Sequence, residues 1–353
     1  MASTTINKLP KGPLYELDPE GDVFLVVYNV PASLPDNLDH LHPTVLSGSL
    51  PLFGEYKSVV KLRVSQKTLS LSSNYYADIF KNPVMAANQT GVQGHLRLPI
   101  MHDNAGGLAF LIVMLIAHHR TRQIPRRLTM DMLLEVALLT DYYKCHGPMA
   151  IWAKTWTQAL TGTPQALQTP ADTASCIVEW VYIAYVFHDR ELFSEVTRTA
   201  IETQTGLVQT DLPIPAVIIN RLNQARFDYL NTLATQLNHL RNAVINGCYQ
   251  ADTSARHTLC THLVYGRFVM TVTRLGLYSF PVAPFIGLRI QDLVESLKHV
   301  QDSPGPAEKG DPTGKVHGFC RLSARVACML DLVDEPVGLE IDDDAFPISA
   351  RDF

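Results

Sequence analysis

The clearest fold signal in the chain is the stretch Ser58-Val59-Val60-Lys61-Leu62-Arg63-Val64-Ser65. Val60, Leu62 and Val64 alternate with two basic side chains, which is the period-two pattern of a strand with one buried face. The residues from 65 to 80 then change to helical spacing. A strand that leads directly into a helix predicts a mixed α and β fold for this part of the chain.

Further strands and helices are predicted on both sides of this stretch. Val23–Val27 and Leu96–Leu98 are rich in strand-forming residues, which predicts two more strands. The apolar run Leu108–Ala117 predicts a buried helix, because ten helical residues rise only about 15 Å and cannot cross a bilayer. Beyond residue 173 the apolar spacing is helical, and the longest predicted helix extends from Pro215 to Asn246-Gly247. The expected core stripe of that helix is Leu222, Ala225, Tyr229, Leu233, Leu237, Leu240 and Val244. The expected fold class is α+β, with a small sheet capped by helices followed by a mainly α-helical domain.

The chain of 353 residues is long enough for about two domains. A Pro- and Gly-containing segment separates them. The predicted parts are a flexible N-terminus (1–17), a first domain (18–160), a linker (161–172), a helical domain (173–332) and an acidic flexible tail (333–353). Residues 331–353 contain eight acidic residues and one arginine, which is a formal charge of −7. Because the whole chain has a net charge of −5, the remaining residues together carry +2.

Several short blocks occur in a fixed order along the first domain. They are Asp18-Pro19-Glu20-Gly21-Asp22-Val23, Val60-Lys61-Leu62-Arg63-Val64-Ser65, Leu69-Ser70-Leu71-Ser72-Ser73, Phe80, Ile116-Ala117-His118-His119-Arg120, Ile124–Thr129 and Leu138–Cys145. Together these blocks resemble the BTB/POZ domain, in the form found in many filamentous-fungal proteins. Trp180–Phe193 is similar to the helical extension of those proteins, and the resemblance covers residues 18 to 332.

The resemblance implies a BTB/POZ-like small sheet capped by helices, and a protein–protein interaction function. It also implies a homodimer, or contact with another BTB-type protein. Some BTB proteins present substrates to cullin ubiquitin ligases, but two features of such adaptors are missing here. The loop 81–94 contains no acidic residue, and no kelch repeat or C2H2 zinc finger follows. We therefore expect a dimerising interaction module without a ligase-adaptor signature.

A second function stays open, because some enzymes need no sequence motif. A cofactor-independent cyclase or isomerase, lyase-like, could bind and orient an apolar metabolite in a pocket lined by the helical region. Aromatic and proton-carrying side chains are the candidates for lining such a pocket: Tyr142, Trp152, Trp156, Trp180, Tyr185 and His188. Aromatic residues at helical spacing also form ordinary hydrophobic cores, so these residues have a structural interpretation as well.

Two His-x-x-Cys units could hold a structural zinc ion. They are His257-Thr258-Leu259-Cys260 and His317-Gly318-Phe319-Cys320, and Cys248 and His262 could replace one of the ligands. Two imidazoles and two thiolates complete a tetrahedral zinc site, which leaves no open position for catalysis. The alternative is that these cysteines are small buried apolar residues. No other cofactor is expected.

The expected location is the cytoplasm or the nucleus. Met1–Pro10 lacks the apolar segment of a secretory signal, and six scattered cysteines are most simply reduced thiols. The sequence shows neither a basic face nor a nucleic-acid-binding motif, and no apolar run is long enough for a membrane span. We expect protein partners or a small apolar metabolite, and no nucleic acid or membrane.

Overall fold

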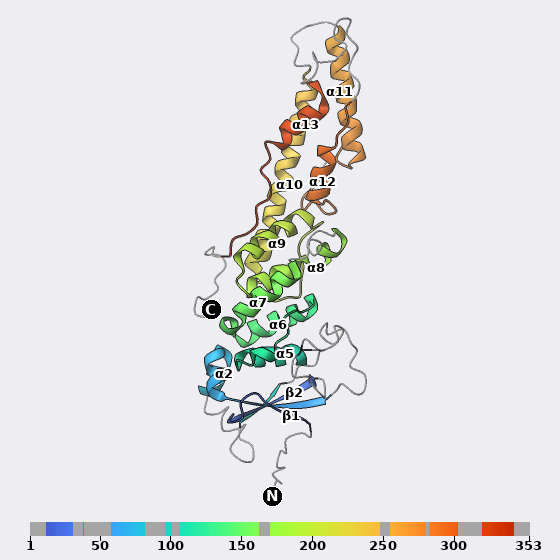
Figure 1. The fold of residues 1–353 in the computed structure, drawn as a ribbon. Coiled ribbons are helices and arrows are strands. Elements are labelled where there is room, and N and C mark those ends of the chain that lie inside the picture. Colours follow the sequence, from blue (N-terminus) through green and yellow to red (C-terminus); the bar gives the residue numbers. More distant parts are fainter. Residues whose placement is uncertain are drawn as a thin grey trace. The chain divides into compact units, whose positions relative to one another are not determined.

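The structure is a computed structural model that describes residues 12–30, 38, 58–81, 96–100, 106–161, 170–247, 255–279, 282–302 and 320–341. The chain divides into two compact units (Figure 1). The described residues of the first unit come from Met1–Thr173 and Glu179–Arg190, and those of the second come from Ala174–Val178 and Glu191–Phe346.

The first unit is built on a four-stranded mixed sheet with the strand order β1-β3-β2-β4. The strands are β1 (Leu14–Glu16), β2 (Val23–Val30), β3 (Ser58–Val64) and β4 (Leu96–Ile100). β2 is antiparallel to β3 and parallel to β4, whereas β1 is parallel to β3. The alternation predicted in β3 is confirmed, because Val60, Leu62 and Val64 are fully buried and the two basic side chains between them are not.

The other elements of the first unit are helical (Figure 1). They are α2 (Gln66–Ser72), α3 (Asn74–Lys81), α5 (Gly107–Ala117), the 3-10 turn η2 (Thr121–Gln123), α6 (Met130–Tyr143), α7 (His146–Thr161) and α8 (Pro170–Val186). Helix α5 contacts β2 on one side and α6 and α7 on the other, and all of its residues are buried. This central position explains its uninterrupted apolar sequence.

The single helical segment expected over 65–80 is two helices. Ser65 caps α2, because its hydroxyl oxygen accepts a hydrogen bond from the Thr68 amide. Ser73 separates α2 from α3 in an extended conformation with φ −148°, and its buried hydroxyl donates to the Tyr143 carbonyl. The same hydroxyl oxygen accepts a hydrogen bond from the Tyr76 amide at 3.2 Å, so Ser73 caps the start of α3.

The second unit is organised around α10 (Ala216–Ile245), which α11 and α13 both contact. Its other helices are α9 (Arg190–Thr203), α11 (Ala255–Arg274), α12 (Ile290–Lys298) and α13 (Leu322–Leu330). The predicted limits of α10 are confirmed. Pro215 precedes its first turn, Asn246 caps its end, and Gly247 follows with a φ of 122°.

The buried stripe of α10 differs from the predicted one at two turns. Ala225 and Tyr229 are expected on the core face, but the structure buries Arg226 and Leu230 instead. The guanidinium of Arg226 donates four hydrogen bonds to backbone carbonyls, those of Gln204, Pro284, Phe285 and Leu288. At these two turns the buried face of α10 is therefore shifted by one residue along the helix. Backbone carbonyls from the segments after α9 and α11 lie there, and the donors of the Arg226 guanidinium satisfy them.

The described parts of the two terminal segments, 12–17 and 333–341, contact the rest of their units. Within the N-terminal segment expected to be flexible, Leu14–Glu16 forms the edge strand β1. Within the predicted tail, the Leu339 amide donates to the Thr197 hydroxyl at 2.9 Å, and Ile341 is buried. Gly338 approaches the Ser194 backbone so closely that a Cβ would overlap it. The acidic composition of this segment does not indicate these contacts, because the residues that make them are the apolar residues and the glycine between the charged ones.

Of the predicted linker 161–172, residues 162–169 lie outside the described residues, whereas Thr161 is the last residue of α7 and residues 170–172 belong to α8. The compact units divide further along the chain, because Glu179–Arg190, the second part of α8 and the turn after it, groups with the first unit. In the part of the chain that the structure describes, no helix combines the length and hydrophobicity needed to cross a bilayer.

Candidate functional site

The sequence blocks that resemble BTB/POZ domains meet in the first unit. Arg63 Nε donates to the Gly21 carbonyl at 2.8 Å, between residues 42 positions apart. A Cβ on Gly21 would lie 2.5 Å from the Val64 carbonyl oxygen, so only glycine allows this approach of the turn to β3. The Ser72 hydroxyl donates to the Ala117 carbonyl at 3.3 Å. These bonds join the turn before β2, the end of β3, α2 and the end of α5.

His118 connects two of these blocks. It caps the end of α5, and its Nδ1–H donates to the Met114 carbonyl at 2.9 Å. Its Nε2 accepts a hydrogen bond from the Ser65 amide at 3.2 Å, at the start of α2. Burial lowers the pKa of His118, and this geometry requires the neutral ring because a protonated Nε2 could not accept. His118 therefore acts as a structural acceptor at neutral pH.

Four tyrosines pack together between α3 and α6. Tyr76 stacks on Tyr143 with ring centroids 5.3 Å apart, and Tyr75 lies 5.4 Å from Tyr142. Burial, followed by the hydrogen bond with Tyr142, raises the pKa of Tyr75 to about 12. Burial also raises the pKa of the neighbouring Cys145 thiol to about 12. These groups stay protonated at neutral pH, so this cluster supplies neither a base nor a thiolate nucleophile.

Asp141 is the charged centre beside the tyrosines. Its carboxylate accepts from Lys144 Nζ at 2.9 Å and from the Tyr182 hydroxyl at 3.5 Å, and it lies 3.9 Å from His146 Nε2. Burial, together with Asp141, raises the pKa of Tyr182. These contacts connect the end of α6 with α8. The Lys144 ammonium and the Tyr182 hydroxyl donate to the carboxylate and so help to position the two helices.

The structure places the six candidate pocket residues on the surface or in the core of the first unit. Trp156 and Trp180 are buried, and the Trp156 indole N–H donates to the Pro125 carbonyl at 2.8 Å. Tyr142 is exposed, whereas Trp152, Tyr185 and His188 are partly exposed. None of the six lines the cavity described below.

The predicted zinc ligands lie partly outside the described residues. His317 and the side chain of His257 are not among them, whereas Cys260 and Cys320 are buried and form no disulfide. Among the described residues, no group of three or more His, Cys, Asp or Glu side chains is arranged to hold a metal ion. The zinc site stays a prediction from the sequence.

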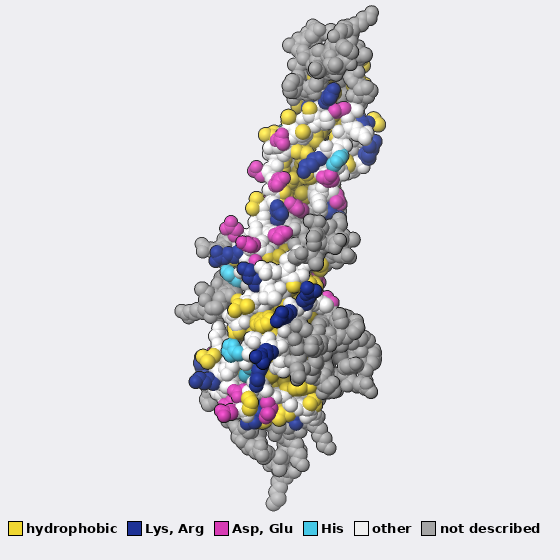
Figure 2. Space-filling view, in the orientation of Figure 1, with side chains coloured by type: hydrophobic (Ala, Val, Ile, Leu, Met, Phe, Trp, Pro, Cys, Tyr) yellow, Lys and Arg dark blue, Asp and Glu magenta, His cyan; other side chains and the backbone are white. Residues whose placement is uncertain are grey.

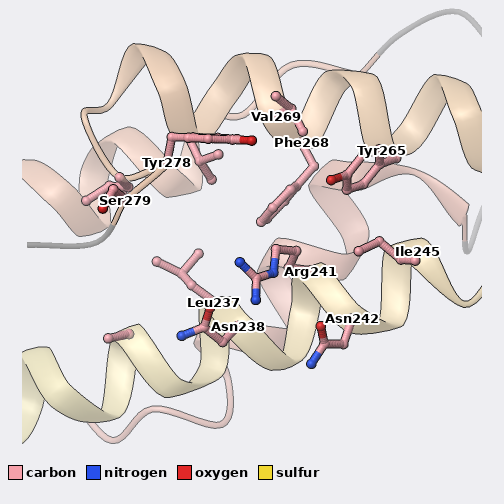
Figure 3. Close-up of a pocket in the computed structure, with 13 residues that line it drawn as sticks. Leu237, Asn238, Arg241, Asn242, Ile245, Tyr265, Phe268, Val269, Tyr278 and Ser279 are labelled. Carbon is pink, nitrogen blue, oxygen red and sulfur yellow. The ribbon is translucent and has the colours of Figure 1, made fainter.

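A cavity of about 610 Å3 lies between α10 and α11 in the second unit (Figure 3). Its wall on α10 is formed by Ala234, Asn238, Arg241 and Ile245, whose spacing of four, three and four places them on one flank of the helix. The opposite wall contains Tyr265, Phe268, Val269 and Val272 of α11. The cavity is therefore the space between the facing flanks of α10 and α11.

The end of α11 closes one side of this cavity. Gly276 adopts a φ of +70°, and the following Leu277 amide donates to the Val272 carbonyl at 2.7 Å. This glycine-terminated helix end turns the chain back, so that Leu277 and Tyr278 reach the cavity. This cavity is not among the sites that the sequence predicts. The pair Leu275-Gly276 after a helical stretch was the available signal for the turn, but the facing flank of α10 gave none.

Comparison with known proteins identifies no relative. No family model matches the chain, and searches of curated proteins and of solved structures give no match. The BTB/POZ resemblance stays a prediction from the residues that carry it.

Proposed function

We propose that this protein is a BTB/POZ-type interaction protein that forms a homodimer through its first unit. The observation that carries the proposal is that the blocks of the resemblance contact one another. Ser65 binds His118 across 53 positions, and Ser73 binds Tyr143 across 70 positions. These contacts fit a fold in which the blocks of the resemblance pack against one another, as the proposal requires.

Two exposed leucines give the first unit a surface for a partner. Leu71 on α2 is 80% exposed, although its neighbour Leu69 is fully buried. Leu14, on the edge strand β1, is 46% exposed. Fully burying one leucine side chain contributes about 1.5–3 kcal/mol to association. A second copy of the chain that covers α2 and β1 would gain this energy and protect the open edge of the sheet.

The charge distribution favours an apolar contact over a purely electrostatic one. On the face shown in Figure 2, basic and acidic side chains are interspersed along the molecule and form no extended patch of one sign. Such a surface gives little long-range attraction to a polyanion or a membrane. A dimer contact through leucine side chains would depend weakly on salt concentration.

The test is the molar mass of the full-length protein in solution, measured by size-exclusion chromatography with light scattering. We expect a dimer at micromolar concentration, and a shift to monomer for Leu71→Glu. Ile151→Glu is the matched control, because Ile151 is also 80% exposed in the first unit but lies on α7. A monomeric wild-type protein at high micromolar concentration contradicts the proposal, and so does equal weakening by the control.

The alternative function, a cofactor-independent cyclase or isomerase, draws no support from the described cavity. Of the residues that the structure describes, thirteen line that cavity, and these thirteen include no Asp, Glu, His, Lys or Cys. Proton transfer during an isomerisation needs a group with a suitable pKa close to the substrate. The described wall offers phenol, amide and guanidinium groups, which can bind a ligand through hydrogen bonds.

A further inference from the structure

We propose that the cavity between α10 and α11 binds a small organic anion, an apolar carboxylic acid with an aromatic body. The proposal is independent of the dimer function, because the cavity belongs to the second unit alone. Its volume of about 610 Å3 lies within the range of about 300–1,000 Å3 that small-molecule sites occupy. Size therefore fits a metabolite rather than a protein segment.

A single positive charge sets the preferred charge of the ligand. Among the described residues that line the cavity, Arg241 is the one with a charged side chain. In the part of the chain that the structure describes, its guanidinium has no hydrogen-bond or ion-pair partner, whereas the nearby Arg267 donates to the Gln301 carbonyl. A guanidinium with five donors and no acceptor matches a carboxylate, which can accept two parallel hydrogen bonds.

Aromatic and aliphatic side chains set the shape of the rest of the ligand. Figure 3 shows the Phe268 ring and the Arg241 guanidinium pointing toward each other from opposite helices. The phenol groups of Tyr265 and Tyr278 stand on the two sides of that space, and Leu237 points into it from α10. Aromatic rings prefer to pack against other rings in offset or edge-to-face arrangements, so an aryl group fits between these residues.

The lining also disfavours other ligand classes. A cation would meet the guanidinium without a carboxylate to balance it, because the described part of the cavity wall contains no acidic residue. A polyphosphate would place several negative charges beside one arginine, in contact with the apolar side chains of Leu237 and Phe268. A monoanion with an apolar body satisfies both parts of the wall.

Calorimetric titration of the full-length protein tests the proposal. The probe is 4-biphenylacetate, and its uncharged primary amide is the matched ligand. We expect the carboxylate to bind and the amide to bind about tenfold or more weakly, because the amide loses the charge-assisted bonds to Arg241. Arg241→Gln should weaken binding of the carboxylate by a similar factor and leave binding of the amide almost unchanged.

The control variant is Arg274→Gln, which removes the same charge from an exposed position of α11 outside the cavity wall. This variant should retain the affinity of the wild-type protein. Tyr278→Ala, at an exposed position of the wall, should weaken both ligands through lost ring contact. Absence of binding by the carboxylate overturns the proposal, and so does equal affinity for the acid and the amide. An equal loss in Arg274→Gln also overturns it, because the charge effect would then be general.

Discussion

Replacing Arg226 by methionine tests the finding that a buried cation organises the second unit. The change keeps an unbranched side chain but removes the donors of four hydrogen bonds, which are 2.8–3.0 Å long. A buried carbonyl without a donor costs about 1–3 kcal/mol, so four would cost about 4–12 kcal/mol. Part of this is offset, because the variant no longer buries a charge. We expect the free energy of unfolding to fall by about 3–5 kcal/mol.

The assay is urea denaturation of the full-length protein, followed by circular dichroism. Arg226→Lys should cost about half as much as the methionine variant, because an ammonium group has at most three donors and lacks the planar fork. Arg241→Met is the control on the same helix, since Arg241 is exposed and unbonded among the described residues. It should change stability by less than about 0.5 kcal/mol. A loss below about 1 kcal/mol for Arg226→Met would refute the reasoning, because the four bonds would then carry no net stability.

Three further predictions concern the first unit and the cysteines. Burial lowers the pKa of His118, so on acidification the unfolded state takes up the proton first. The stability contributed by the neutral ring should therefore be complete above about pH 6.5 and decline below it. His118→Asn, whose amide can replace both hydrogen bonds, should show a smaller decline in the urea midpoint between pH 7 and 5. Gly21→Ala should lower stability by about 1–3 kcal/mol, because the added Cβ meets the Val64 carbonyl, and a thermal midpoint equal to that of the wild type would contradict this close approach. Alkylation at pH 8, followed by peptide mass spectrometry, should modify the exposed Cys328 well before the buried Cys145; comparable rates at the two cysteines would show that Cys145 is accessible.

Much of the first unit could be predicted because its signals are local. Thr129 belongs to a residue type favoured at helix N-caps, and its hydroxyl oxygen accepts a hydrogen bond from the Met132 amide at the start of α6. The apolar run of α5 ends at His118-His119, where His119 has a φ of 57°. The bond between His118 and Ser65 could not be predicted, because it joins residues 53 positions apart through packing of α5 against α2.

For the candidate sites, too, the sequence indicates residue types, whereas packing decides which side chains line a cavity. The six aromatic and histidine candidates were chosen by residue type, but type does not distinguish a core residue from a pocket residue. Trp156 is buried with its N–H bonded to Pro125, so its polar atom is satisfied inside the unit. The cavity that the structure contains is lined by Arg241 and Phe268 from two helices whose facing flanks are set only by their packing.

The sequence by itself determined the elements of this protein: the alternating strand β3, the apolar helix α5, and the proline and glycine that bound α10. These depend on spacing along the chain, which the order of residues specifies directly. Only the tertiary structure decided that Arg226 replaces an apolar core residue, that Leu339 docks on Thr197, and where a cavity remains. Those features depend on which distant carbonyl, hydroxyl or helix flank lies opposite, and spacing along one segment does not carry that information.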